Sequence, residues 1–161
     1  MRELIASVDG SILAQELPSE LCEICDEGWS VSPCGSYVLA ALYDPSLESI
    51  AESEGLPYLE LEVNDVKIPD LDLLNDLSSY LPRVASRGLS FAVTALGKAR
   101  KSGLADSLVA VVSTGVGDDY LTHGTTVKFY TRRDNYPDWF DDLERFAIEA
   151  MALIEGVECG S

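Results

Sequence analysis

The sequence predicts a single α+β domain in which helices pack on a mostly antiparallel sheet. The chain has 161 residues, 47% of them hydrophobic, which is enough to build one ordinary core. Helical and strand-like patterns are mixed without regular β–α–β alternation, and two strand-like runs near the end are expected to pair as an antiparallel hairpin. We therefore expect residues 1–161 to form one domain, a sandwich of helices and sheet.

The first predicted elements are a strand, a short helix and a loop. Residues 2–8 have a strand-like composition and are followed by Asp9-Gly10, a turn signal. Pro18 and the polar residues after it open a helix that is expected to end at Gly28. Residues 29–35 are rich in serine, proline and glycine, so they are expected to form a loop.

Two further strands are expected before residue 65. Residues 37–43 are a continuous apolar run of strand length, which is typical of a strand covered on both faces. Residues 44–55 are polar and are expected to form a helix or turn. Residues 58–63 alternate between apolar and polar, which predicts a strand with Glu60 and Glu62 side by side on its solvent face.

Three helices and two strands are expected in the remainder. Leucines at helical spacing predict a helix over 69–82, which Pro82 ends or kinks. Residues 90–101 predict a second helix with a cluster of cations in its last turn, where they suit the helix dipole. Residues 107–112 and 125–132 are the two strands of the hairpin. Apolar residues at steps of three and four then predict a closing helix over 137–154.

The cysteines are interpreted as buried free thiols. Cys22 and Cys25 form a C-x-x-C pair inside the first predicted helix, where their spacing places both sulfurs on one face. A metal site or a redox centre is the alternative, but Cys34, Cys159 and the lone His123 do not supply a second closely spaced ligand pair. No metal and no cofactor are therefore expected.

The charge is the strongest compositional signal. The chain carries 28 acidic and 11 basic residues, a formal net charge of −17. The charge is unevenly distributed: residues 1–76 sum to −15, residues 77–133 to +5 and residues 134–161 to −7. Such a charge disfavours direct binding to nucleic acid or to an anionic membrane, and it favours a cationic partner. The alternative is that the acidity only keeps the protein soluble or reflects a high-salt host.

The start of the chain does not resemble a secretory signal, and no apolar run approaches the ~20 residues that span a bilayer. A cytoplasmic location is therefore expected. Reactive residue types gather only in the loop 113–124, where two adjacent carboxylates, a tyrosine and the histidine could bind a cation or a substrate. Turn formation or recognition explains the same residues, and no other catalytic motif is present, so we expect no enzymatic activity.

Acidic surfaces are the better candidates for function. Carboxylates accompanied by aromatic side chains can steer a basic protein and anchor it, whereas the alternative is a solvated acidic face with Trp139 in the core. The oligomeric state is left open. The candidate partner-binding residues are Glu48, Glu52, Glu60, Glu62, Asp65, Asp118, Asp119, Tyr120, Asp138, Trp139, Asp141 and Asp142.

A small, acidic, cytoplasmic α+β chain without a catalytic motif resembles the bacterial immunity proteins of contact-dependent and polymorphic toxin systems. The resemblance rests on size and charge over the whole chain, so it assigns no role to any single residue. It implies an inhibitor that neutralises a basic toxin, possibly a nuclease, by protein–protein binding. Three alternatives stay open: a phage or plasmid nucleic-acid mimic directed against host defence, a small enzyme or ligand-binding domain that uses the 113–124 loop, and an assembly subunit.

Overall fold

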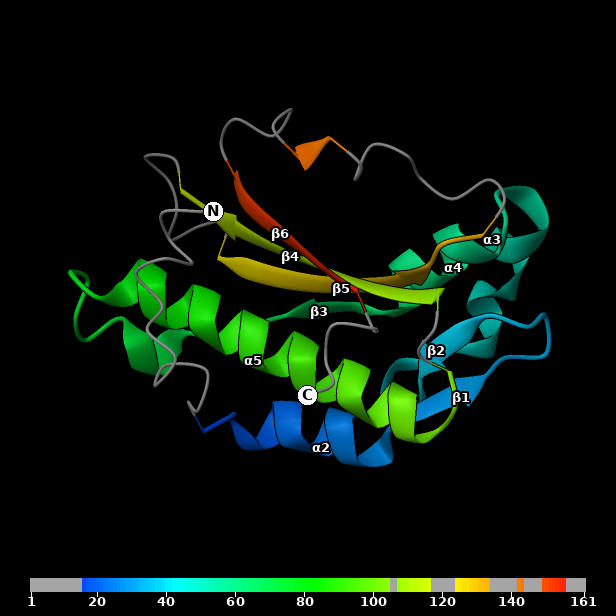
Figure 1. Ribbon diagram of the computed structural model, residues 1–161, viewed down its shortest axis with the longest axis horizontal. Coiled ribbons are helices and arrows are strands. Elements are labelled where there is room, and N and C mark those ends of the chain that lie inside the picture. Colours follow the sequence, from blue (N-terminus) through cyan, green and yellow to red (C-terminus); the bar gives the residue numbers. More distant parts are fainter. Residues whose placement is uncertain (1–15, 105–106, 117–123, 134–141, 144–148, 156–161) are drawn as a thin grey trace.

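The protein is an α+β fold built on antiparallel sheet, as the sequence predicts. The computed structural model describes residues 16–104, 107–116, 124–133, 142–143 and 149–155. Within these ranges, a four-stranded sheet has the order β3-β5-β4-β6, and a long helix, α5, runs across one of its faces (Figure 1). None of the helices in these ranges has the length and apolar character needed to cross a membrane. The strand predicted over 2–8 lies outside the described residues.

The two inner strands of this sheet form the predicted hairpin. Strand β4 (Leu108–Gly115) pairs antiparallel with β5 (Thr125–Thr131), in a register that runs from Leu108 opposite Thr131 to Thr114 opposite Thr125. Strand β3 (Asp65–Lys67) joins the outer side of β5. Almost every residue of β4 is buried, because side chains pack on both faces of the sheet.

The second outer strand corrects a prediction. Residues 149–155 form strand β6 (Glu149–Glu155), which pairs antiparallel with β4 over seven residues, instead of the last part of a helix over 137–154. Ala150, Met151 and Ala152 are consecutive and buried, which suits a strand covered on both faces and not a helix with one apolar stripe. In residues 149–154, the helical spacing of the apolar residues therefore did not indicate a helix.

The helix predicted over 90–101 is confirmed as part of α5 (Tyr80–Lys101), which begins earlier than predicted, whereas the helix predicted over 69–82 is wrong except at its end. The leucine-rich segment before it forms only turns and the short 3-10 helix η4 (Leu71–Leu73). Pro82 lies in the first turn of α5, where an N–H has no helical acceptor, so it neither ends nor kinks the helix. At Gly88 the helix backbone approaches the sheet so closely that an added Cβ would lie 2.9 Å from Thr125 Cγ2.

Helix α4 (Leu56–Val63) packs on part of the other face of the sheet, and it also corrects a prediction. The alternating residues 58–63 form a helix, not a strand. Leu61 packs on Val109, Val111, Tyr130 and Met151 of the sheet, while Leu59 and Val63 pack beneath the preceding 3-10 helix η3 (Pro45–Leu47) and helix α3 (Glu48–Ser53). The helix is buried on most of its sides, so its sequence carries no clear helical stripe.

Helix α2 (Ser19–Glu27) confirms the first predicted helix and runs beside α5 (Figure 1). The expected loop over 29–35 contains strand β1 (Trp29–Val31), which pairs with β2 (Tyr37–Leu39). The strand predicted over 37–43 therefore stops early and continues as the 3-10 helix η2 (Ala40–Leu42). Trp29 holds this hairpin on α5, because its Nε1 donates to Ala95 O at 2.8 Å and its ring meets Phe129 edge-on.

Candidate functional site

Many acidic side chains in the described residues are used inside the molecule. Ion pairs join one basic and one acidic residue at five places: Arg87–Asp72, Lys98–Asp26, Lys128–Asp65, Arg132–Glu155 and Arg133–Glu60. Of the predicted binding residues, Asp65 is therefore engaged with Lys128 across the β3–β5 ladder at 2.7 Å. A surface pair of this kind contributes little stability, but it removes a free carboxylate from the surface.

Glu60 corrects the prediction most clearly, because it is fully buried and cannot face a partner. Its Oε1 accepts hydrogen bonds from Tyr37 N at 2.8 Å and Arg133 Nη2 at 3.0 Å. Its Oε2 accepts from Thr131 N at 2.6 Å and from Thr131 Oγ1. The carboxylate thus ties helix α4 to β2 and β5, which is a structural role.

Asn64 at the end of α4 completes this connection to β2. Its Oδ1 accepts from Leu39 N at 2.8 Å, and its Nδ2 donates to Tyr37 O at 2.9 Å. Together with Glu60, it supplies β2 with the hydrogen bonds that a neighbouring strand would otherwise make.

The other predicted carboxylates in this part of the chain are on the surface of α3 and α4. Glu52 and Glu62 are exposed, and Glu48 is half-buried. Tyr43 Oη donates to Glu48 Oε1 at 2.5 Å, and this hydrogen bond raises the pKa of Tyr43 to about 12. Hydrogen bonds from Cys34 and Tyr43 hold the pKa of Glu48 below its usual range. Glu48 is therefore a local structural acceptor, and Glu52 and Glu62 remain available.

Of the remaining predicted residues, only Asp142 lies within the described part of the chain. Asp142 is exposed. The other predicted binding residues lie outside the described residues: Asp118, Asp119, Tyr120, Asp138, Trp139 and Asp141. Most of the 113–124 loop also lies outside them.

A row of exposed carboxylates on α2 was not among the predicted residues. Glu20, Glu23 and Glu27 are spaced by three and four residues, so they lie on one side of the helix, and Glu16 lies just before the helix begins. We call these four residues the acidic row. The excess of acids over residues 1–76 includes them, but the sequence reasoning used the helix only for its cysteines.

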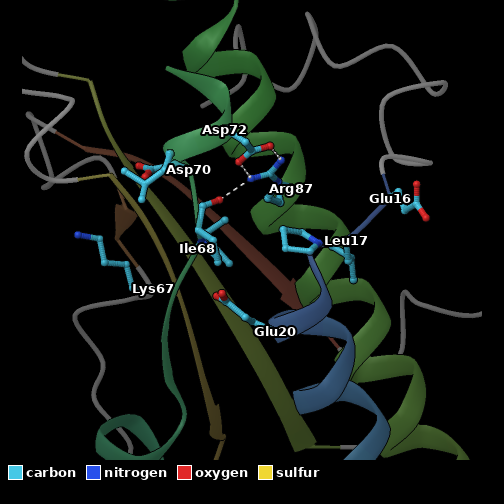
Figure 2. Close-up of a pocket in the computed structure, with 11 residues that line it drawn as sticks. Glu16, Leu17, Glu20, Lys67, Ile68, Asp70, Asp72 and Arg87 are labelled. Atoms are coloured by element: carbon cyan, nitrogen blue, oxygen red, sulfur yellow. Dashed lines mark hydrogen bonds and ion pairs between the residues drawn. The ribbon is translucent and has the colours of Figure 1, made fainter. Parts of the chain in front are cut away.

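Glu16 and Glu20 of the acidic row line a pocket of about 790 Å³. Figure 2 shows Glu16, Leu17 and Glu20 on one side of it, and the strand end with Lys67, Ile68 and Asp70 on the other. The pocket is lined by Glu16, Leu17, Pro18, Glu20, Lys67, Ile68, Pro69, Asp70, Leu71, Asp72 and Arg87. Its walls are therefore partly apolar, and its rim holds four carboxylates.

Arg87 fixes one side of this pocket. The guanidinium, whose side chain is only 6% exposed, donates from Nη1 and Nη2 to the two oxygens of Asp72 at 2.8 and 2.7 Å, and Nη1 also donates to Pro69 O (Figure 2). These hydrogen bonds hold the pKa of Asp72 below its usual range. Tyr80 Oη donates to Asp70 Oδ2 at 2.6 Å. Two residues of α5 thus position the segment 69–72.

The thiols and the described carboxylates offer no metal centre. Among the described residues, no group of three or more His, Cys, Asp and Glu side chains could hold a metal ion. Cys25 is buried, and burial raises its pKa to about 11. Cys22 is exposed, which contradicts the expectation that both thiols lie in the core, because the buried stripe of α2 passes through Leu21 and Cys25.

Comparison of the chain with protein-family models, with curated proteins and with solved structures gave no match.

Proposed function

We propose that the chain is an acidic binding protein, which neutralises a basic protein partner in the manner of a bacterial immunity protein. The observation that carries the proposal is the acidic row beside the pocket. Two of its carboxylates, Glu16 and Glu20, lie at the rim of a partly apolar recess, and Glu23 and Glu27 continue the negative charge along α2, so a cationic surface can meet both charge and shape.

The acidic row lowers the intrinsic stability of the helix that carries it. Like charges three or four residues apart cost an isolated helix about 0.2–0.5 kcal/mol per pair. The last turn of α2 contains Asp26 and Glu27 and no basic residue, although the negative end of the helix dipole favours cations there. Lys98 of α5 pairs with Asp26, whereas no ion pair within the described residues involves Glu20, Glu23 or Glu27. A function outside the folded chain explains why these charges are present.

A toxin that acts on nucleic acid is the most natural partner, because its active site must attract phosphate and is therefore basic. The acidic row would draw such a surface toward the inhibitor and cover it. Action in the cytoplasm of a bacterium belongs to the same proposal.

The test compares two variants that have the same net charge. In the first, the row is reversed by Glu20→Lys, Glu23→Lys and Glu27→Lys. The control reverses three exposed carboxylates in or beside α3 and α4 that do not line the pocket, by Glu52→Lys, Glu54→Lys and Glu62→Lys, so it also tests Glu52 and Glu62 as the binding residues predicted from the sequence. Each chain is used to capture basic proteins from the native host, and association rates with the captured protein are measured by stopped flow.

The wild-type association rate should fall steeply between 50 and 500 mM salt, because the encounter is electrostatic. Reversal of the row should slow association at low salt by at least about tenfold, within the range that steering can supply. The control should change the rate far less. Equal loss in the two variants would mean that net charge alone acts, and a salt-independent rate would remove the basis of the proposal.

A further inference from the structure

Three exposed leucines, each three residues after the last, lie in the segment that leads into α5. Backbone hydrogen bonds from Leu73 N to Asp70 O, from Asp76 N to Leu73 O and from Ser79 N to Asp76 O close three successive three-residue turns. Leu71, Leu74 and Leu77 occupy the same position in each turn, directly after the residue whose carbonyl accepts the hydrogen bond. We call these three residues the leucine ridge.

The ridge is unusual because of its exposure. Leu71 is 83% exposed, Leu77 is 52% exposed and Leu74 is 39% exposed, whereas Leu73 of the same segment is fully buried. The other large apolar side chains that are exposed in the described residues are three single valines far apart in the sequence: Val31 in β1, Val93 in α5 and Val116 after β4. Isolated apolar side chains are ordinary on a surface, but a group of them marks a place of association.

The ridge is held in place before any partner arrives. Arg87 binds Pro69 O and the Asp72 carboxylate at its start. Asp76 accepts hydrogen bonds from the Ser78 and Ser79 hydroxyls at 2.6 and 2.7 Å near its end. A preformed surface loses less conformational entropy on binding than a flexible one.

The charges around the ridge indicate what it binds. Asp72 and Asp76 alternate with the leucines, and Leu71 itself lines the pocket whose opposite wall carries Glu16 and Glu20. An apolar strip bordered by carboxylates complements a partner segment that has apolar residues on one face and lysine or arginine beside them.

A helix can match the order of these contacts. The three leucines offer successive apolar contacts along the segment, and an amphipathic helix presents apolar residues every three or four positions on one face. The apolar part of the pocket, Leu17, Pro18 and Ile68, can take the stem of a lysine whose ammonium reaches the carboxylates at the rim.

We propose that the leucine ridge and the adjoining pocket bind a basic amphipathic helix of the partner protein. This inference rests on the proposed function and adds the chemistry of the partner. The leucines supply apolar contact, and the carboxylates of Glu16 and Glu20 select for cationic neighbours.

The probe is a fluorescein-labelled 18-residue helical peptide made of leucine on one face and lysine on the other, and its dissociation constant is measured by anisotropy. In the ridge variant, Leu71→Ser, Leu74→Ser and Leu77→Ser are combined. The matched control combines Val31→Ser, Val93→Ser and Val116→Ser, which removes the same number of exposed apolar side chains elsewhere. All six side chains are exposed, and urea unfolding verifies that both variants fold.

Wild type should bind the peptide, the ridge variant should bind at least tenfold more weakly, and the control variant should bind within about twofold of wild type. A peptide with glutamate in place of lysine should not bind. Equal binding by the ridge variant and the wild type would overturn the ridge proposal.

The row reversal at Glu20, Glu23 and Glu27 separates this inference from the proposed function. If it weakens peptide binding while the ridge variant does not, the ridge proposal fails and the acidic row retains its role. If only the ridge variant weakens binding and salt has no effect, the electrostatic function fails. Sedimentation equilibrium tests a second copy as the occupant: a wild-type dimer that becomes monomeric in the ridge variant would overturn the proposal.

Discussion

Replacement of Glu60 by glutamine tests how much the buried carboxylate stabilises the fold. Each oxygen of Glu60 accepts two hydrogen bonds, one pair from Tyr37 N and Arg133 Nη2 and the other from Thr131 N and Thr131 Oγ1. Glutamine has nearly the same shape, but one oxygen becomes an NH₂ group that faces two donors. The change therefore removes the charge and two of the four hydrogen bonds without leaving a cavity.

The expected loss follows from the burial of the site. A hydrogen bond to a charged group contributes about 1.5–3 kcal/mol, and breaking a buried ion pair costs roughly 3–5 kcal/mol. Arg133 is still partly exposed, so its charge can be hydrated after the change, and we expect the lower part of this range. The free energy of unfolding should fall by about 3 kcal/mol, a large part of the roughly 5–15 kcal/mol of an ordinary domain.

Urea unfolding followed by circular dichroism measures this loss. With a slope near 2 kcal/mol per molar urea, the midpoint should move down by about 1.5 M. Glu62→Gln is the matched control, because Glu62 is two residues away on the same helix and exposed, and it should change stability by less than about 0.5 kcal/mol. If the two variants unfold at the same urea concentration, the hydrogen bonds assigned to Glu60 do not stabilise the protein as described.

Two further predictions concern α5 and its ion pair. Gly97→Ala should raise the free energy of unfolding by about 0.5–1 kcal/mol, because an added Cβ meets nothing within 4 Å and alanine favours helix. Gly88→Ala should lower the free energy of unfolding by about 1 kcal/mol, because the Cβ would press on the stiff side chain of Thr125. Urea unfolding of both variants measures these changes, and shifts of the same sign and size would contradict the prediction. Asp72→Asn should cost about 1 kcal/mol at pH 7, after discounting for the exposure of this carboxylate. The pKa of Asp72 is lowered in the folded state, so its stabilisation is present above the unfolded pKa of about 3.9 and is lost as pH falls through the folded value. Unfolding curves from pH 7 to pH 2 should therefore converge for wild type and variant, and a constant gap would refute the assignment.

The elements that the sequence predicted correctly are those whose local signals agree with their surroundings. Helix α2 begins after Pro18 and ends at Gly28, which has φ of 72°, so both of its boundaries are marked in the sequence. The β4–β5 hairpin joins two runs of β-branched and apolar residues that are buried in the same sheet. In both cases, propensity and packing favour the same structure.

Helix α4 was missed because its polar residue is buried. The alternation over 58–63 assumed that Glu60 faces water, but the side chain points into the fold and is paired there. A single sequence does not reveal that Arg133, distant along the chain, supplies the cation. Pro57 near the start of the helix and Gly55 before it were the available local signals.

Strand β6 shows tertiary pairing overriding local propensity. Its residues, Glu-Ala-Met-Ala-Leu-Ile-Glu, include several good helix formers, so the pattern favoured a helix. Pairing with β4 buries both faces and decides the outcome.

The candidate site was likewise predicted only as a region: charge totals identified the acidic half of the chain, but only the structure separates carboxylates used internally from the acidic row.

The side chains of Glu60 and Asn64 have a consequence for how the protein behaves at high concentration. They form hydrogen bonds with the N–H groups of Tyr37 and Leu39 and with the carbonyl of Tyr37. An edge strand would otherwise offer these groups to another molecule. Unpaired edge strands promote aggregation and fibril growth, because another strand can add to them. Here a helix blocks that route with polar side chains, so loss of Glu60 should increase the tendency to form aggregates as well as weaken the fold.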